Sequence, residues 1–247
     1  MIRLEGVVMA YATDEGSSVQ ALRGIDLCIE RGETVCLVGA SGCGKTTVLR
    51  VMNRLEQPSS GRVLVGGNDI AQVDPIRLRR GMGYVIQSGG LFPHMTVEQN
   101  VGLLCDLEGW DSERTRSRVH ELLAQVHLPA PDYARRFPAQ LSGGERQRVG
   151  VARALALDPE IVLLDEPFGA LDPVTRASLQ AEFLELRRGL GKTLVLVSHD
   201  LDEAFLLADR VAFISAGAVL QTGTRDDFER TPAGPEVERF MKGLGGA

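Results

Sequence analysis

Eight residues near position 40 have a spacing that binds phosphate. They are Gly39, Ala40, Ser41, Gly42, Cys43, Gly44, Lys45 and Thr46, and Thr47 follows them. The glycines let the backbone curl so that successive N–H groups point into one hollow, and a following helix adds partial positive charge at its N-terminus. Lys45 is predicted to reach the β- and γ-phosphates of a nucleotide, and the Thr46 hydroxyl to ligate Mg²⁺. The stretch predicts nucleotide binding but does not indicate which class of nucleotide-binding protein this is.

Four more polar residues follow apolar runs that we expect to form buried strands. Gln87 follows residues 82–86, Asp165 and Glu166 follow residues 161–164, and His199 comes shortly after residues 193–197. The carboxyl ends of parallel strands meet at one edge of a sheet, where ligands bind. Asp165 is predicted to hold Mg²⁺ through water, and Glu166 to orient or deprotonate an attacking water. His199 would contact the γ-phosphate, and Gln87 would sense the metal and its water shell.

The elements that position these residues alternate between strand and helix patterns. Alternating apolar residues at 2–33 predict two or three antiparallel strands around a polar turn at 13–18, and residues 62–65 predict another strand. Periodicity predicts helices at 97–107, 112–126, 146–157, 175–190 and 201–208, a break at 129–138, and a strand pair at 211–214 and 219–222. We therefore expect one α/β domain spanning 1–247. It would have an N-terminal antiparallel β lobe, an α-helical lobe inserted at about 88–158, and a tail at about 224–247 with one short, frayed helix.

Composition argues against several classes of protein. A net charge of −6 and a pI near 5.3 argue against a nucleic-acid binder, whose affinity comes from clustered Lys and Arg. No apolar run approaches the roughly 18–20 residues that cross a bilayer, and no signal-peptide pattern follows Met1, so we expect a cytoplasmic protein. The cysteines lack CxxC spacing, which argues against a zinc site or a disulfide framework. Cys43 differs from the others, because Lys45 and the helix N-terminus beside it favour the reactive thiolate.

Taken in order, the motifs resemble those of the ATP-binding-cassette family of ATPases. They are GASGCGKT at 39–46, Gln87, LSGGE at 141–145, IVLLDEP at 161–167, GALD at 169–172 and His199. The LSGGE motif is the most diagnostic, because other phosphate-loop ATPases lack it. The resemblance spans nearly the whole chain and implies a RecA-like phosphate-loop NTPase core, with ATP and Mg²⁺ as cofactors.

The resemblance also implies that two chains would share each nucleotide. Relatives pair two cassettes head to tail, so this chain would form a homodimer or pair with a second cassette. A helix N-terminus would then present four residues to the partner's ATP: Ser142, Gly143, Gly144 and Glu145. Asp172 would cross the dimer contact. Tyr11 would stack on the adenine, although a tyrosine at a strand end is just as often a packing residue.

The surface around residues 87–101 resembles the site where a cytoplasmic helix of a membrane-spanning permease docks. It includes Leu91, Phe92, Pro93 and His94. The alternative is that Leu91 and Phe92 only cap the helical lobe. Docking would hold the protein at the inner face of the cell membrane, where a chain without a membrane segment could transmit force to a partner.

The segments 83–97 and 171–176 look most like those of bacterial importers for glycine betaine, choline and related osmoprotectants, which also use an extracytoplasmic solute-binding protein. Amino-acid importers, sulfonate importers and lipoprotein-releasing exporters stay open as alternatives. Many osmoprotectant relatives continue into regulatory domains, whereas this sequence ends at Ala247, which leaves sensing of ionic strength open. Non-transport cassettes are less well matched, because DNA-repair members insert long coiled coils before the LSGGE motif and ribosome-associated members carry two phosphate loops.

Overall fold

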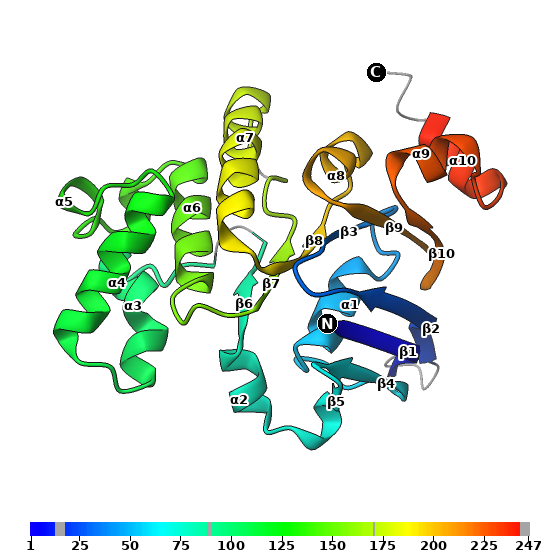
Figure 1. Cartoon of the computed structure of the whole chain (residues 1–247), viewed down its shortest axis with the longest axis horizontal. Helices are drawn as coiled ribbons and strands as arrows, with labels where there is room; N and C mark the ends of the chain where they lie inside the picture. The colour runs from blue at the N-terminus through cyan, green and yellow to red at the C-terminus, as the bar shows by residue number, and fades with distance from the viewer. Residues whose placement is uncertain (13–17, 88–89, 170, 243–247) are drawn as a thin grey trace. The chain divides into compact units, whose positions relative to one another are not determined.

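The computed structural model describes residues 1–12, 18–87, 90–169 and 171–242 (Figure 1). The chain divides into two compact units, Met1–Arg79 together with Thr193–Ala247, and Arg80–Lys192. The second unit is therefore an insertion in the sequence of the first. This division does not test the helical lobe expected at about 88–158, which stays a prediction.

The first unit contains a four-stranded antiparallel sheet in the order β2-β1-β4-β5. Its strands are β1 (Ile2–Ala12), β2 (Ser18–Ile29), β4 (Ser60–Val65) and β5 (Asn68–Asp69). Apolar residues of β1 such as Ile2 and Leu4 are buried while Arg3 between them is exposed, which is the period of two that buries one face of a sheet. The expected N-terminal β lobe is confirmed, with two strands between residues 2 and 29.

The first unit also contains four strands in the order β10-β9-β3-β8. These are β3 (Thr34–Val38), β8 (Thr193–Val197), β9 (Arg210–Ser215) and β10 (Ala218–Gly223). β3 runs parallel to both β8 and β9, and every residue of β3 and β8 is buried, as continuous apolar runs in parallel sheets require. The helices α1 (Lys45–Met52) and α8 (Leu201–Leu207) follow β3 and β8, so the loop after each of these strands leads into a helix N-terminus.

The C-terminal residues of the first unit form two helices, α9 (Arg225–Arg230) and α10 (Pro235–Lys242). The ring of Phe240 packs on that of Phe213 in β9 at 4.5 Å between centroids. We expected one short helix in this tail. The second helix was missed because its burial depends on this contact with a distant strand.

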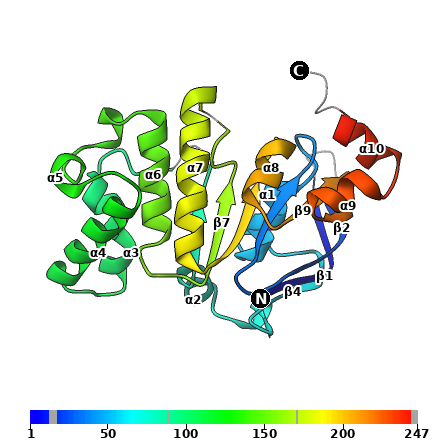
Figure 2. The ribbon, with the colours of Figure 1, turned by 45° about the horizontal axis from the view of Figure 1, so that its top comes forward.

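The second unit pairs two parallel strands, β6 (Met82–Val85) and β7 (Ile161–Asp165). Its helices are α3 (Val97–Leu107), α4 (Ser112–Gln125), α5 (Ala130–Tyr133), α6 (Gly143–Ala154) and α7 (Pro173–Leu190), with a 3₁₀ turn at Pro138–Gln140. α3, α4 and α6 pack together around buried Val101, Val119 and Val149, and α6 and α7 run side by side (Figure 2). Helices expected within 97–107, 112–126, 146–157 and 175–190 are confirmed as α3, α4, α6 and α7, whereas α5 was not predicted and lies in the expected break at 129–138.

Side-chain caps set where the helices of the second unit begin. We expected helices from Arg146 and Thr175, but α6 begins at Gly143 and α7 at Pro173. Ser142 and Asp172 accept hydrogen bonds from the first amides of these helices, which extends each helix to its cap. Both expected starts were therefore wrong by two or three residues.

The remaining secondary-structure predictions are partly confirmed. The helix at 97–107 and the strand at 193–197 are confirmed with the expected bounds. β5, a 3₁₀ turn at Ile70–Gln72 and the helix α2 (Pro75–Arg80) were not predicted. Ala170 and most of the expected turn at 13–18 lie outside the described residues. Among the residues described, none of the helices has the length and apolar character to cross a membrane.

Candidate functional site

The glycine-rich loop of the first unit joins the carboxyl end of β3 to α1, as expected. Gly39 has φ +150°, and a Cβ at this position would lie 2.1 Å from the backbone oxygen of Ile214. Gly44 has φ +108°, and its Cβ would lie 2.7 Å from the backbone oxygen of Ala21. Only glycine fits at either position, because the backbone conformation and the close neighbours both exclude a side chain. The loop therefore has its shape before any ligand arrives.

Lys45 lies inside this loop and is only 5% exposed. Its ammonium group donates to the backbone oxygens of Gly39 at 2.7 Å and Ala40 at 2.9 Å, and lies 3.9 Å from the Cys43 sulfur. These contacts hold the ammonium group against the backbone of the loop. A desolvated ammonium without a carboxylate partner among these contacts is suited to attract an anion.

His199 follows β8, the parallel neighbour of β3, so the first unit brings it to the same sheet edge as the phosphate loop. The turn that carries it is held by Ser198, whose hydroxyl accepts from the Asp200 amide at 2.9 Å, and by Asp200, which caps α8. His199 itself is exposed. Thr46 and Thr47, in the first turn of α1, are half-buried. Tyr11 lies near the end of β1 and is 36% exposed.

The second unit brings Gln87, Asp165 and Glu166 to the carboxyl ends of β6 and β7. The Gln87 amide nitrogen donates to Oε2 of Glu166 at 2.9 Å, while Asp165 is buried, with the Tyr84 hydroxyl 3.5 Å from its Oδ2. The φ of Glu166 is +45°, a left-handed conformation that costs about 1–3 kcal/mol outside glycine and clusters at functional sites. The expected meeting of Gln87 with the carboxylates is seen, and Tyr84 is a neighbour that sequence reasoning missed.

Ser142 and Glu145 form a reciprocal cap at the start of α6. The Ser142 hydroxyl accepts from the Glu145 amide at 3.2 Å, and Oε2 of Glu145 accepts from the Ser142 amide at 2.7 Å. The hydrogen bond from the Ser142 amide lowers the pKa of Glu145, so this carboxylate stays charged near neutral pH. Ser142 and Gly143 are exposed, and the first amides of a helix have no partner within it. The start of α6 is thus an exposed site with N–H and O–H donors and positive helix-dipole charge.

Asp172 is the corresponding cap of α7. Its Oδ1 accepts from the amides of Val174 at 3.1 Å and Thr175 at 3.0 Å. Hydrogen bonds from Thr175, and then from Val174, lower the pKa of this exposed carboxyl group. The side chain predicted to cross a dimer contact is therefore already ordered within its own chain.

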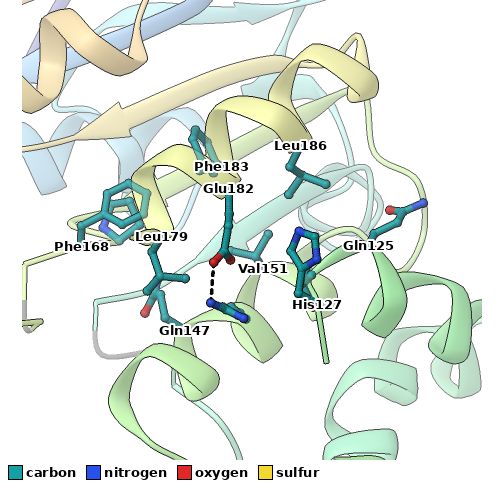
Figure 3. Close-up of a pocket in the computed structure, with 12 residues that line it drawn as sticks. Gln125, His127, Gln147, Val151, Phe168, Leu179, Glu182, Phe183 and Leu186 are labelled. Carbon is teal, nitrogen blue, oxygen red and sulfur yellow. Dashed lines mark hydrogen bonds and ion pairs between the residues drawn. The ribbon is translucent and has the colours of Figure 1, made fainter. Parts of the chain in front are cut away.

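A cavity of about 40 Å³ lies in the second unit between α6 and α7 (Figure 3). Apolar side chains such as Phe168, Leu179 and Phe183 line it, and Arg148 and Glu182 form an ion pair at 2.7 Å beside it. It is much smaller than the roughly 150 Å³ that holds one benzene molecule. None of the residues predicted to bind nucleotide lines this cavity, so it is not the nucleotide site.

The fold and these sites together define a phosphate-loop α/β protein: a strand, glycine loop and helix with a buried lysine in one unit, and a carboxylate pair at a parallel strand end in the other. Comparison with known proteins agrees, because residues 22–169 match the family model described as ABC transporter. The chain belongs to the ABC transporter family.

Two curated relatives from Bacillus subtilis are similar along almost the whole chain. The chain is 50% identical to the glycine betaine/carnitine/choline transport ATP-binding protein OpuCA and 48% identical to the choline transport ATP-binding protein OpuBA. Each match covers 98% of this chain and 62% of the relative. The chain thus spans about three fifths of the length of these relatives.

A solved structure supports the fold directly. The dimeric ATP-binding cassette MJ0796, in a post-hydrolysis state bound to ADP and Pi, superposes with a TM-score of 0.81 at 34% identity. The match covers 91% of this chain and 98% of the other. The expected phosphate-loop NTPase fold is confirmed.

Proposed function

We propose that this chain is the ATP-hydrolysing subunit of a membrane transporter. The observation that carries the proposal is the preformed phosphate loop, in which the buried ammonium group of Lys45 is held by two backbone oxygens. Burial of the Lys45 ammonium group costs free energy unless an anion compensates its charge. A nucleotide polyphosphate is the anion that fits, with the loop amides and α1 supplying further positive potential.

The residues predicted to act on magnesium carry suitable oxygen donors. Thr46 contributes a hydroxyl, Asp165 a buried carboxylate and Gln87 an amide oxygen, all of them the hard oxygen ligands that Mg²⁺ prefers. We propose that Thr46 binds the ion directly, and that Asp165 and Gln87 act on it or its water shell. When bound, the ion would neutralise charge on the β- and γ-phosphates.

Glu166 is the proposed general base. Its carboxylate would orient and deprotonate the water that attacks the γ-phosphate, with Gln87 holding one of its oxygens at 2.9 Å. His199 would contact the γ-phosphate and keep that water in line. Tyr11 is exposed and is proposed to stack on the adenine.

The exposed start of α6 supports a head-to-tail pair of cassettes. The Ser142 oxygen already accepts from the Glu145 amide, so its O–H can donate to a phosphate oxygen of the partner's ATP. The amides of Gly143 and Gly144 would donate to the same phosphate, and Asp172 would cross the contact. Glu145 would act there through its cap on Ser142. Each chain would then complete the other's ATP site.

The proposed permease-docking surface is residues 91–94. Phe92 is 42% exposed, although a phenylalanine is normally buried. Its backbone is fixed by buried Asn100, which accepts from the Phe92 amide at 2.8 Å and donates to its carbonyl at 3.1 Å. An exposed aromatic on a rigid support suits a docking contact better than a simple cap would. Docking here would place the protein at the inner face of the cell membrane.

The names of the relatives support glycine betaine, choline or a related osmoprotectant as the solute, taken up with permease subunits and an extracytoplasmic binding protein. The test is uptake of labelled solutes by the native host after deletion of this gene. We expect loss of glycine betaine or choline uptake, restored by the wild-type gene but not by Glu166→Gln. Loss of amino-acid or sulfonate uptake instead would assign one of the alternative importers, and absence of ATPase activity in the purified protein would overturn the proposal.

A further inference from the structure

Tyr133, the last residue of α5, contacts the cap of α6 from a separate element. Its hydroxyl donates to Oε1 of Glu145 at 2.8 Å, while the other carboxylate oxygen of Glu145 accepts from the Ser142 amide. This hydrogen bond is the main cause that raises the pKa of Tyr133, so the hydroxyl keeps its proton. Both oxygens of Glu145 are therefore occupied, which restricts the carboxylate to one orientation.

Tyr133 is itself held in place on two sides. The Arg136 guanidinium lies over its ring at 4.2 Å from the centroid, and Nε of Arg136 donates to the Asp132 carbonyl at 2.8 Å. The backbone beside it is joined to α3, because the Glu98 amide donates to the Ala134 carbonyl at 2.9 Å. The tyrosine is thus attached to the helix that follows the proposed docking surface.

We propose that Tyr133 is a positioning residue that holds Glu145, and through it the hydroxyl and amide donors of Ser142, in the orientation that binds the partner chain's nucleotide. The inference rests on the proposed function, because it assigns a role within the shared ATP site. Tyr133 is outside every motif that the sequence analysis used. Only the fold brings its hydroxyl to Glu145, which lies twelve positions further along the chain.

The physical reason is that a capping carboxylate on a half-exposed helix end has several rotamers available. Losing the Tyr133 hydroxyl would release Oε1 and let Glu145 leave the Ser142 amide part of the time. Ser142 would then present its donors in the productive geometry less often. Binding of ATP to the chain's own phosphate loop would be unaffected, since Tyr133 has no part in that loop.

The test uses Tyr133→Phe in a Glu166→Gln background, which is expected to trap the ATP-bound dimer. The substitution removes one hydroxyl and keeps the ring beneath Arg136, so the fold is preserved. We expect the ATP concentration for half-maximal dimer formation, measured by light scattering, to rise about three- to tenfold. Affinity of the monomer for ATP should stay unchanged. Combining Tyr133→Phe with Glu145→Ala should add nothing to the effect of Glu145→Ala alone.

Matched arginine variants test the support of the ring. Arg136→Leu should also weaken dimer formation. Arg114→Leu should not, although it removes a similar cation–π contact: Arg114 in α4 lies 3.6 Å from the ring centroid of Trp110, which precedes the helix.

The outcomes separate the two proposals. If the Glu166→Gln parent does not dimerise with ATP, the proposed function fails. If the parent dimerises and Tyr133→Phe dimerises at the same ATP concentration, the role of Tyr133 is overturned. Additive effects of Tyr133→Phe and Glu145→Ala would also overturn it, because they would show that Tyr133 does not act through Glu145.

Discussion

We expect replacement of Glu166 by glutamine to separate ATP binding from hydrolysis. Oε2 of Glu166 accepts a hydrogen bond from the Gln87 amide at 2.9 Å, and the carbonyl oxygen of the new amide can accept the same bond. The left-handed backbone at this position, φ +45°, costs a glutamine about as much as a glutamate. Neither the local geometry nor the stability should therefore change greatly.

Glu166→Gln would remove the carboxylate that we propose accepts a proton from water. Loss of a general base costs about 10²- to 10⁴-fold in rate, or about 3–5 kcal/mol of barrier. Loss of one negative charge should also favour the closed pair around the γ-phosphate. We therefore expect normal ATP affinity, a kcat reduced by at least about a hundredfold, and an ATP-dependent dimer.

Phosphate release and size-exclusion chromatography with Mg-ATP measure these outcomes. The matched control is Glu160→Gln, an exposed glutamate just before β7, at the opposite end of the strand from Glu166. It should hydrolyse ATP at the wild-type rate. Hydrolysis at the wild-type rate by Glu166→Gln, or a monomer that has lost ATP affinity, would refute the assignment of Glu166 as the base.

Further predictions concern the phosphate loop and the cysteines. Lys45→Ala should lower ATP affinity at least tenfold, because a charge-assisted contact with phosphate is worth about 1.5–3 kcal/mol, and an unchanged calorimetric affinity would contradict this. Gly39→Ala should destabilise the fold by about 1–3 kcal/mol, because the new Cβ would lie 2.1 Å from a backbone oxygen. The control Gly189→Ala in α7 should be neutral or stabilising, because the space around its Cβ is open. Equal melting temperatures for these two alanine variants would be the contrary result. The thiol of Cys43, expected to be reactive, is buried at 8% exposed, so a maleimide should label it only slowly, and only without Mg-ATP. Cys36 should stay unlabelled, because burial raises the pKa of its thiol. Mass spectrometry that finds Cys36 labelled before Cys43 would count against this.

The sequence predicted the elements whose signals are local. Continuous apolar runs identified β7 and β8, because a strand buried on both faces can expose no polar side chain. The periodicity of residues 97–107 identified α3 with the observed bounds. The polar residues that end these strands followed from the same reasoning, since the end of a buried strand is where the chain can first carry polar groups to a ligand.

Helix starts show where local reasoning was incomplete. The S-x-x-E spacing of Ser142 and Glu145 is itself a capping-box signal, yet the helix was expected only from Arg146. The glycines at 143 and 144 have low helix propensity and argued against an earlier start. The cap outweighed that propensity, because it satisfies amides that would otherwise lack partners.

Contacts between residues far apart in the chain were decided by the tertiary structure alone. The donation of Gln87 to Glu166 joins the ends of two strands, and that of Tyr133 to Glu145 joins two helices. Sequence spacing placed Gln87 and Glu166 at one sheet edge, but it could not show that their side chains would bond, and it gave Tyr133 no role at all. A hydrogen bond needs its two atoms within about 3 Å and well aligned, and only the packing of whole elements determines positions to that precision.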